Sequence, residues 1–249
     1  MINRLVRALR SFVKRLFRAL GYDFFRVTPD GVEYERIMPE ARYAPWKSDQ
    51  AFQAAYRAVE SNTLVDPYRC YELWSLVEQS AKLEGSLLEV GVWKGGTGAL
   101  IAARARLSGI ADPVYLCDTF RGIVKASEHD LHVDGAYADT SAELVRRFLD
   151  GLKLENVEVL EGIFPEETAK QIPQSRFRFC HIDVDVYQSA KDVLEWVWPK
   201  LVVGGMVVYD DYGGEGCEGI VRHVREQMSK SDRIFLHNLN GHAAFIKTK

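Results

Sequence analysis

The chain has 249 residues, enough to bury a full hydrophobic core, and 47% of them are hydrophobic, with a mean hydropathy of -0.17. A net charge of -3 argues against a general nucleic-acid-binding protein, which needs a basic surface to release counterions. The four cysteines are scattered and form no Cys-x-x-Cys pair, which favours a reducing cytoplasm over a disulfide framework. We therefore expect a cytoplasmic α/β protein with no nucleic-acid partner.

Residues 1–22 carry six basic residues and no acidic one, so the rest of the chain carries about -9, from -3 minus 6. Apolar residues recur there at three- and four-residue steps, from Ile2 to Leu20, which predicts an amphipathic helix. Charges interrupt it too often for a membrane span, and no small-residue cleavage site follows. Three interpretations stay open: packing on the domain or on a second subunit of a homo-oligomer, peripheral contact of residues 1–20 with the inner membrane surface, and a disordered tail.

An irregular, Pro-punctuated connector follows over about residues 21–45. Helical patterns then run over 49–60 and, after the Asp66-Pro67 start signal, over 67–83. We expect residues 1–60 to form the N-terminal helix and a wrapping arm, and residues 61–249 to form the main domain.

From residue 86 onward, strand and helix patterns alternate. The predicted strands are 86–90, 114–117, 157–160, 178–182, 206–209, 234–237 and 243–246. The predicted helices are 97–107, 142–152, 166–171, 188–197 and 218–228. The last two strands flank Asn238–Gly241, a hairpin turn. The pattern predicts a mostly parallel seven-stranded sheet with one antiparallel strand and with helices on both faces. The long polar stretch 123–140 is typical of a lid or binding loop.

Acidic residues stand at the ends of two of these strands: Asp183 near the end of one, and Asp210 and Asp211 at the end of the next. Parallel sheets bind ligands outside the carboxyl ends of their strands. Carboxylates that converge there at roughly 4 Å, with an effective dielectric near 20, repel by about 4 kcal/mol per pair unless a cation neutralises them. Oxygen ligands with no nearby Cys or His pair favour Mg²⁺, Mn²⁺ or Ca²⁺ over zinc.

A glycine-rich turn containing Gly91, Gly95 and Gly96 leads from the first strand of the sheet into a helix. Such a turn allows a ligand to approach the backbone, but its spacing is not the G-x-G-x-x-G of dinucleotide-binding proteins. Glu89 and Asp118, at the tips of the first two strands, favour a ligand that is cationic at one end and carries a ribose at the other, which points to S-adenosylmethionine. A tight turn without a ligand, and Asp118 as a simple cap, remain alternatives.

Five motifs occur in an order that is characteristic of one family. They are Glu89-Val-Gly91 with Gly95-Gly96, Asp118-Thr-Phe-Arg-Gly122, Gly162-Ile-Phe164-Pro165-Glu166, His181-Ile-Asp183-Val-Asp185-Val-Tyr187, and Gly204-Gly205 with Asp210-Asp211-Tyr212. Over about residues 60–225 this set resembles the TylF (macrocin) family of O-methyltransferases. The resemblance implies a Rossmann-like class I methyltransferase fold, S-adenosylmethionine and Mg²⁺ (or Mn²⁺) as cofactors, and a sugar hydroxyl or related oxygen as the acceptor.

The resemblance also implies roles for individual residues. It assigns metal binding to Asp183, Asp210 and Asp211, and the general base to Asp185. The cofactor set is Glu89, Gly91, Gly95, Gly96, Thr97, Asp118, Thr119, Phe120 and Gly162. A bound cation can lower the pKa of a hydroxyl, and a nearby carboxylate can then take its proton. Alternation along a strand would put Asp183 and Asp185 on the same side. Arg121 departs from the acid common in the family, which leaves the acceptor open.

Two other functions match part of the sequence. Asp183-Val-Asp185 also matches the D-x-D motif of metal-dependent glycosyltransferases, but that interpretation leaves Asp210-Asp211 and the glycine turn unexplained. A non-catalytic methyltransferase-like docking partner is the second alternative, and the intact acidic set argues against it. We expect His181, within an apolar strand, to be a hydrogen-bonded core residue rather than a ligand. The expected acceptor is a small molecule or glycan: a sugar of a surface-polysaccharide precursor first, and a glycosylated metabolite second.

Overall fold

The computed structural model describes residues 13, 16–17, 19–22, 41–128, 130–214 and 216–249. The chain divides into two compact units, Met1–Glu40 and Ala41–Lys249. In the first unit Val13, Leu16, Phe17 and Ala19 are helical, whereas the basic residues of the predicted amphipathic helix lie outside the described residues. Among the described residues no helix has the length and apolar character that a membrane crossing requires.

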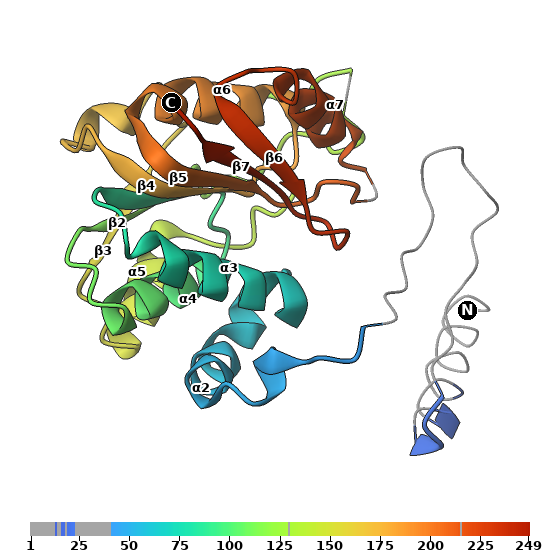
Figure 1. Cartoon of the computed structure of the whole chain (residues 1–249). Coiled ribbons are helices and arrows are strands. Elements are labelled where there is room, and N and C mark those ends of the chain that lie inside the picture. The colour runs from blue at the N-terminus through green and yellow to red at the C-terminus, as the bar shows by residue number, and fades with distance from the viewer. Residues whose placement is uncertain (1–12, 14–15, 18, 23–40, 129, 215) are drawn as a thin grey trace. The chain divides into compact units, whose positions relative to one another are not determined.

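A seven-stranded sheet forms the centre of the second unit (Figure 1). Its strands are β1 (Ser86–Val90), β2 (Val114–Asp118), β3 (Val157–Glu161), β4 (Phe177–Ile182), β5 (Leu201–Tyr209), β6 (Arg233–His237) and β7 (Ala243–Lys247). The strand order is β3-β2-β1-β4-β5-β7-β6, and β7 runs antiparallel to both of its neighbours. The mostly parallel sheet with one antiparallel strand is therefore confirmed.

Helices cover both faces of this sheet (Figure 1). The α-helices are α2 (Gln50–Val59), α3 (Pro67–Ser80), α4 (Gly96–Leu107), α5 (Ala142–Gly151), α6 (Tyr187–Val197) and α7 (Glu218–Gln227). Short 3-10 turns occupy Pro45–Lys47, Glu60–Asn62, Ala169–Gln171 and Trp198–Lys200. One apolar core lies between the sheet and α2 to α5, and a second lies between the sheet and α6 and α7. The central parallel strands β1, β2 and β4 are thus buried on both faces, as their apolar runs predict, whereas the edge strand β3 keeps exposed residues.

Helix caps explain where the helices next to the site begin. The Asp66 carboxylate accepts hydrogen bonds from the backbone N–H of Tyr68 (2.8 Å) and Arg69 (3.1 Å), and Pro67 occupies the first helical position of α3. By contrast, α4 begins at Gly96, and the residue before it, Gly95, is left-handed and provides no side-chain cap. The first N–H groups of α4 are therefore available to a ligand at the sheet edge.

Three details differ from the sequence-based expectations or extend them. Strand β5 begins at Leu201 rather than 206, because the strand continues through Gly204 and Gly205 with a register shift against β4. The helix predicted over 166–171 is only a 3-10 turn, since the Glu167 carboxylate bonds the backbone N–H of Ile163 (2.8 Å) and closes a tight turn there. Helix α2 belongs to the unit Ala41–Lys249, and the predicted division at residue 60 stays a prediction.

A buried histidine on α7 should make stability depend on pH. Burial lowers the pKa of His223 to about 4, and its Nε2 lies 3.2 Å from Tyr209 Oη. The unfolded chain takes up this proton near pH 6.5 and the folded protein only near pH 4, so this contribution is full above about pH 6.5 and is lost as pH falls toward 4. His223→Gln should remove about 2 kcal/mol of the stability difference between pH 7 and pH 5.

Urea unfolding at the two pH values measures this difference. His237→Gln on β6 serves as the control: burial also lowers the pKa of His237, but this histidine is exposed, so the variant should keep most of the wild-type pH dependence. Equal pH dependence in His223→Gln and wild type would show that His223 is not the buried neutral group described above.

Candidate active site

A cleft opens at the carboxyl edge of the parallel strands, between the ends of β1, β2, β4 and β5. Its cavity volume is about 180 Å³, and the cleft is open to solvent at its mouth. Two segments that sequence reasoning did not connect to the sheet edge also line it: residues 62–65, before α3, and part of the loop 122–137. The cleft lies at the edge where α/β sheets bind their ligands.

Backbone strain is concentrated around this cleft. After each of the strands β1, β2, β4 and β5, one non-glycine residue adopts a positive φ: Trp93 (47°), Phe120 (52°), Asp185 (61°) and Asp211 (59°). Each such residue costs on the order of 1–3 kcal/mol, and strain of this kind clusters at functional sites. The four turns together indicate that this edge is shaped for binding or chemistry.

Asp118 ties the first two strand ends together. One carboxylate oxygen accepts hydrogen bonds from the backbone N–H of Val92 (2.6 Å) and Trp93 (2.9 Å), and the other accepts one from Phe120 N–H (2.6 Å). Asp118 therefore caps the glycine turn and also lines the cleft. Each carboxylate oxygen has further acceptor capacity, so the capping role leaves room for ligand hydroxyls.

Gly91 is required at its position. Its φ is 88°, and a Cβ added there would lie 1.6 Å from the carbonyl oxygen of Asp183. The end of β1 thus touches the end of β4, which brings the glycine turn and the acidic segment into the same cleft.

The predicted cofactor residues fall into two groups. Gly91, Thr97, Asp118, Thr119 and Gly162 line the cleft. Glu89, Gly95, Gly96 and Phe120 are not among the lining residues of the cleft, and their direct contact with a cofactor stays a prediction.

Glu89 and Gly96 have clear structural partners. Glu89 is fully buried, and its Oε1 lies 2.9 Å from Nδ1 of His181. A Cβ on Gly96 would lie 2.6 Å from the carbonyl oxygen of Asn62. His181 is therefore a hydrogen-bonded core residue, as expected, and Gly96 allows the segment before α3 to close on the glycine turn.

The acidic residues at the ends of β4 and β5 converge as predicted. Asp183, Asp210 and Asp211 each offer an oxygen within 4.8 Å of the others, and all three line the cleft. Arg69 Nη1 lies 2.6 Å from Asp210 Oδ2 and 3.6 Å from Asp211 Oδ1, while His242 Nε2 lies 2.7 Å from Asp210 Oδ1. Burial alone would raise the pKa of Asp210, but the neighbouring His242 and Arg69 lower it.

At the other carboxyl groups of the cleft, nearby positive charges do not offset the effect of burial on the pKa. Burial and the charges of Asp210 and Asp211 raise the pKa of Asp183 well above its ordinary value. Burial, followed by the charges of Asp210 and Asp185, raises the pKa of Asp211 to about 8, and burial raises that of Asp185 to about 6. The cluster therefore retains protons near neutral pH, which a divalent cation would displace. Its all-oxygen donor set fits Mg²⁺ or Mn²⁺.

Asp185 reaches the cleft by a route other than the expected one. Strand β4 ends at Ile182, so the strand alternation invoked for Asp183 and Asp185 does not apply. The chain turns instead, with Val186 N–H bonded to the Val184 carbonyl (2.7 Å) and Asp185 in the left-handed region. Both carboxylates nevertheless line the cleft.

Several charged residues around Asp210 were not predicted from the sequence. Arg69 and Glu72 stand on one face of α3, and Glu72 Oε2 lies 2.6 Å from His242 Nδ1. Their spacing of three residues was a possible signal for a shared face, but their contacts with Asp210 and His242 span the whole domain.

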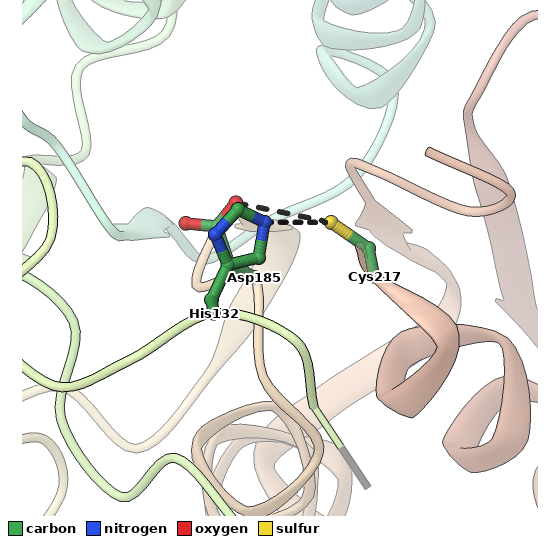
Figure 2. A group of neighbouring side chains, drawn as sticks. All are labelled: His132, Asp185 and Cys217. Atoms are coloured by element: carbon green, nitrogen blue, oxygen red, sulfur yellow. Dashed lines mark hydrogen bonds between the residues drawn. The ribbon is translucent and has the colours of Figure 1, made fainter. Parts of the chain in front are cut away.

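The statement that no Cys or His pair lies near the acidic cluster was wrong. Figure 2 shows His132, Asp185 and Cys217 side by side: Cys217 Sγ lies 3.6 Å from His132 Nε2 and 4.0 Å from Asp185 Oδ1. His132 comes from the long polar loop and Cys217 from the segment before α7. Only the fold brings these residues together, so sequence spacing carried no signal for the group.

Comparison with known proteins gives one family. The model of the macrocin-O-methyltransferase (TylF) family matches residues 38–245. A relative from Streptomyces olivaceus, 8-demethyl-8-(2,3-dimethoxy-alpha-L-rhamnosyl)-tetracenomycin-C 4'-O-methyltransferase, is 34% identical over 161 residues, which are 60% of this chain and 61% of that protein. Mycinamicin III 3''-O-methyltransferase from Micromonospora griseorubida is 31% identical over 70% of this chain and 74% of its own length. The structure of the O-methyltransferase NovP superposes with a TM-score of 0.67 at 28% identity, covering 76% of this chain and 83% of that one.

Proposed function

Because this chain belongs to the macrocin-O-methyltransferase (TylF) family, we propose that it transfers the methyl group of S-adenosylmethionine to a sugar hydroxyl with the help of a divalent cation. The observation that carries this proposal is that residues suited to a methyl donor (the donor half) and residues suited to a cation and an acceptor (the acceptor half) line the same cleft. The glycine turn capped by Asp118 lies at the ends of β1 and β2, and the acidic cluster lies at the ends of β4 and β5. A methyl donor and an acceptor could therefore meet there.

The donor half is suited to a nucleoside that bears a positive charge. Asp118 offers carboxylate oxygens to ribose hydroxyls, Gly91 permits close approach of the ligand to the backbone, and the uncapped start of α4 offers N–H groups. Phe164 and Val193 add apolar lining. S-adenosylmethionine, when bound, supplies an electrophilic methyl group on a sulfonium, and the nearby carboxylates match its positive charge.

The acceptor half provides a base and a place for a cation. Asp183, Asp210 and Asp211 would hold a divalent cation, which would lower the pKa of an acceptor hydroxyl and fix its direction. Arg69 and His242 keep Asp210 ionised. Asp185, whose pKa of about 6 leaves it mostly ionised at neutral pH, would take the proton of the acceptor hydroxyl.

One relative supports an acceptor class. The name of the tetracenomycin-C 4'-O-methyltransferase includes a dimethoxy-rhamnosyl group, which favours a sugar of a glycosylated metabolite over a polysaccharide precursor. A cytoplasmic location, a homo-oligomer and contact of residues 1–20 with the inner membrane surface stay proposals based on the sequence. The glycosyltransferase and the non-catalytic partner are the alternatives that the next experiment tests.

Asp118→Ala should weaken binding of both S-adenosylmethionine and S-adenosylhomocysteine. Loss of a charged hydrogen-bond acceptor costs about 1.5–3 kcal/mol, which corresponds to about a 10- to 150-fold loss of affinity in calorimetry. Glu161→Ala is the matched control: Glu161 lies opposite Asp118 in the register of β2 and β3 but is exposed and outside the cleft lining. Its affinity should equal that of wild type.

The same calorimetry separates the alternatives. Because Asp118 also caps the glycine turn, Asp118→Asn serves as a second variant that keeps one acceptor oxygen and should show a smaller loss. A wild-type protein that gives no heat with either sulfur compound but binds a uridine nucleotide would contradict the proposal and favour the glycosyltransferase.

A further inference from the structure

Three different ligand types meet beside the acidic cluster in the group formed by His132, Asp185 and Cys217. Their Nε2, carboxylate and Sγ atoms lie within 4.8 Å of one another, with 3.6 Å between Sγ and Nε2 and 4.0 Å between Sγ and Asp185 Oδ1 (Figure 2). Cys217 is buried, and the other two side chains are half-buried. None of the roles proposed above uses Cys217 or His132.

Backbone contacts hold the loops that carry these side chains in register. Leu131 N–H bonds the Gly216 carbonyl (3.4 Å), next to His132 on one side and Cys217 on the other. A Cβ on Gly216 would lie 3.2 Å from His132 Nε2, so glycine lets the imidazole approach the thiol.

A further hydrogen bond joins the loop that carries His132 to the turn that carries Asp185. Asp130 Oδ1 accepts a hydrogen bond from Tyr187 N–H (2.9 Å), two residues after Asp185, and the same oxygen would lie 2.0 Å from a Cβ on Gly219. The absence of a side chain at Gly219 therefore allows Asp130 to reach Tyr187. The three ligand-bearing segments are thus joined by one backbone–backbone hydrogen bond and one side chain–backbone hydrogen bond.

The distances between the three side chains match those between the ligands of a tetrahedral zinc ion. Zinc lies about 2.3 Å from a Cys sulfur and about 2.0–2.2 Å from a His nitrogen or a carboxylate oxygen, so two ligands of a tetrahedral ion are about 3.5 Å apart. The observed 3.6 Å between Sγ and Nε2 agrees with this value, and the 4.0 Å between Sγ and Oδ1 requires only a small rotation. A sulfur, nitrogen and oxygen set selects Zn²⁺ and similar ions, whereas the oxygen-only cluster selects Mg²⁺.

We propose that His132, Asp185 and Cys217 form a second metal site, which binds Zn²⁺ or a similar thiophilic divalent ion and inhibits the enzyme by engaging Asp185. The binding site is independent of the proposed function, whereas the inhibition rests on the role of Asp185 as the base. A carboxylate that ligates zinc no longer takes a proton from the acceptor hydroxyl. Binding releases a proton from the thiol, because burial and the neighbouring carboxylates raise the pKa of Cys217 above its ordinary value.

Cobalt(II) tests the site directly, because a thiolate ligand gives it a charge-transfer absorption that oxygen ligands do not. The full chain, saturated with Mg²⁺, is titrated with Co²⁺ and then with Zn²⁺. We expect one equivalent of Co²⁺ to bind with the thiolate absorption, and Zn²⁺ to displace it. Cys217→Ser should abolish the absorption, and His132→Gln should weaken Zn²⁺ binding by about a hundredfold, because loss of even an outer-shell partner costs 10–100-fold.

His237→Gln is the matched control, since it removes an exposed histidine on β6 that lies outside this group, and it should bind like wild type. No thiolate absorption in wild type, or an unchanged absorption in Cys217→Ser, would overturn the site. A Zn²⁺ affinity of His132→Gln equal to that of wild type would remove His132 from it.

Methyl transfer measured at saturating Mg²⁺ tests the inhibitory role. Zn²⁺ bound at one equivalent should suppress transfer in wild type but not in Cys217→Ser, each compared with its own rate without Zn²⁺. Zinc binding without loss of transfer would overturn the inhibition. If no methyl transfer occurs under any condition, the proposed function fails, whereas the cobalt spectrum still decides whether the metal site exists.

Discussion

Asp183→Asn should abolish the rise in melting temperature that Mg²⁺ produces and should lower turnover by about a thousandfold. Asp183 is half-buried in the acidic cluster, and desolvation and its acidic neighbours raise its pKa, so it accepts a cation in place of a proton. Asparagine keeps the shape of the side chain but removes the charge that attracts the cation. A thousandfold loss corresponds to about 4 kcal/mol of transition-state stabilisation, within the range for removal of a catalytic charge or metal contact.

The melting temperature of Asp183→Asn without metal distinguishes loss of the metal site from misfolding. Because it removes one of several repelling carboxyl groups, Asp183→Asn should melt at or above the temperature of the metal-free wild type, which excludes misfolding as the cause of lost activity. Asp210→Asn should differ, since it leaves Arg69 and His242 without their carboxylate and should lower the melting temperature. Glu161→Gln, at the end of β3, is the control that should leave the Mg²⁺ response unchanged. A normal Mg²⁺ response in Asp183→Asn would contradict the assigned ligand set.

Asp185→Asn should separate binding from chemistry. The variant should bind S-adenosylmethionine and Mg²⁺ as wild type does, yet lose methyl transfer by about 10²–10⁴-fold, the usual contribution of general base catalysis. The reason is that Asp185 lines the cleft beside the cluster with a pKa near 6, but is not one of the three grouped oxygen ligands.

Calorimetry, the Mg²⁺ melting shift and initial rates at saturating donor give the three readouts. Asp139→Asn is a suitable control, because Asp139 is an exposed carboxylate near the cleft that bonds the Trp93 and Lys94 side chains. It should keep the wild-type rate. Retained methyl transfer in Asp185→Asn would show that another group takes the proton, whereas lost Mg²⁺ binding would make Asp185 a metal ligand.

The sequence predicted the sheet edge better than it predicted the surroundings of the edge. Apolar strands that end in acid, at Asp183 and at Asp210-Asp211, already placed the carboxylates at one edge, because parallel strands bring their carboxyl ends together. The glycine turn was also predicted from the sequence. The structure gives the reason for one of its glycines: Gly91 must accommodate the Asp183 carbonyl oxygen, and only glycine can do so.

Tertiary contacts account for the residues that were not predicted. Arg69 and His242 reach Asp210 from α3 and from the start of β7, and no local pattern records contacts at that sequence separation. Strand alternation failed for Asp185 because the strand had already ended. The group of His132, Asp185 and Cys217 assembles from three loops, and loop conformation depends on backbone contacts such as that between Leu131 and Gly216.

The central claim is that methyl transfer in this cleft requires a divalent cation. It is tested most directly by incubating the full chain with labelled S-adenosylmethionine and a panel of sugar-bearing acceptors, nucleotide sugars and glycans included, with and without excess chelator. We expect label in an acceptor with Mg²⁺ present, loss of transfer to background in chelator, and recovery when Mg²⁺ is restored in excess. Full methyl transfer in excess chelator would contradict it.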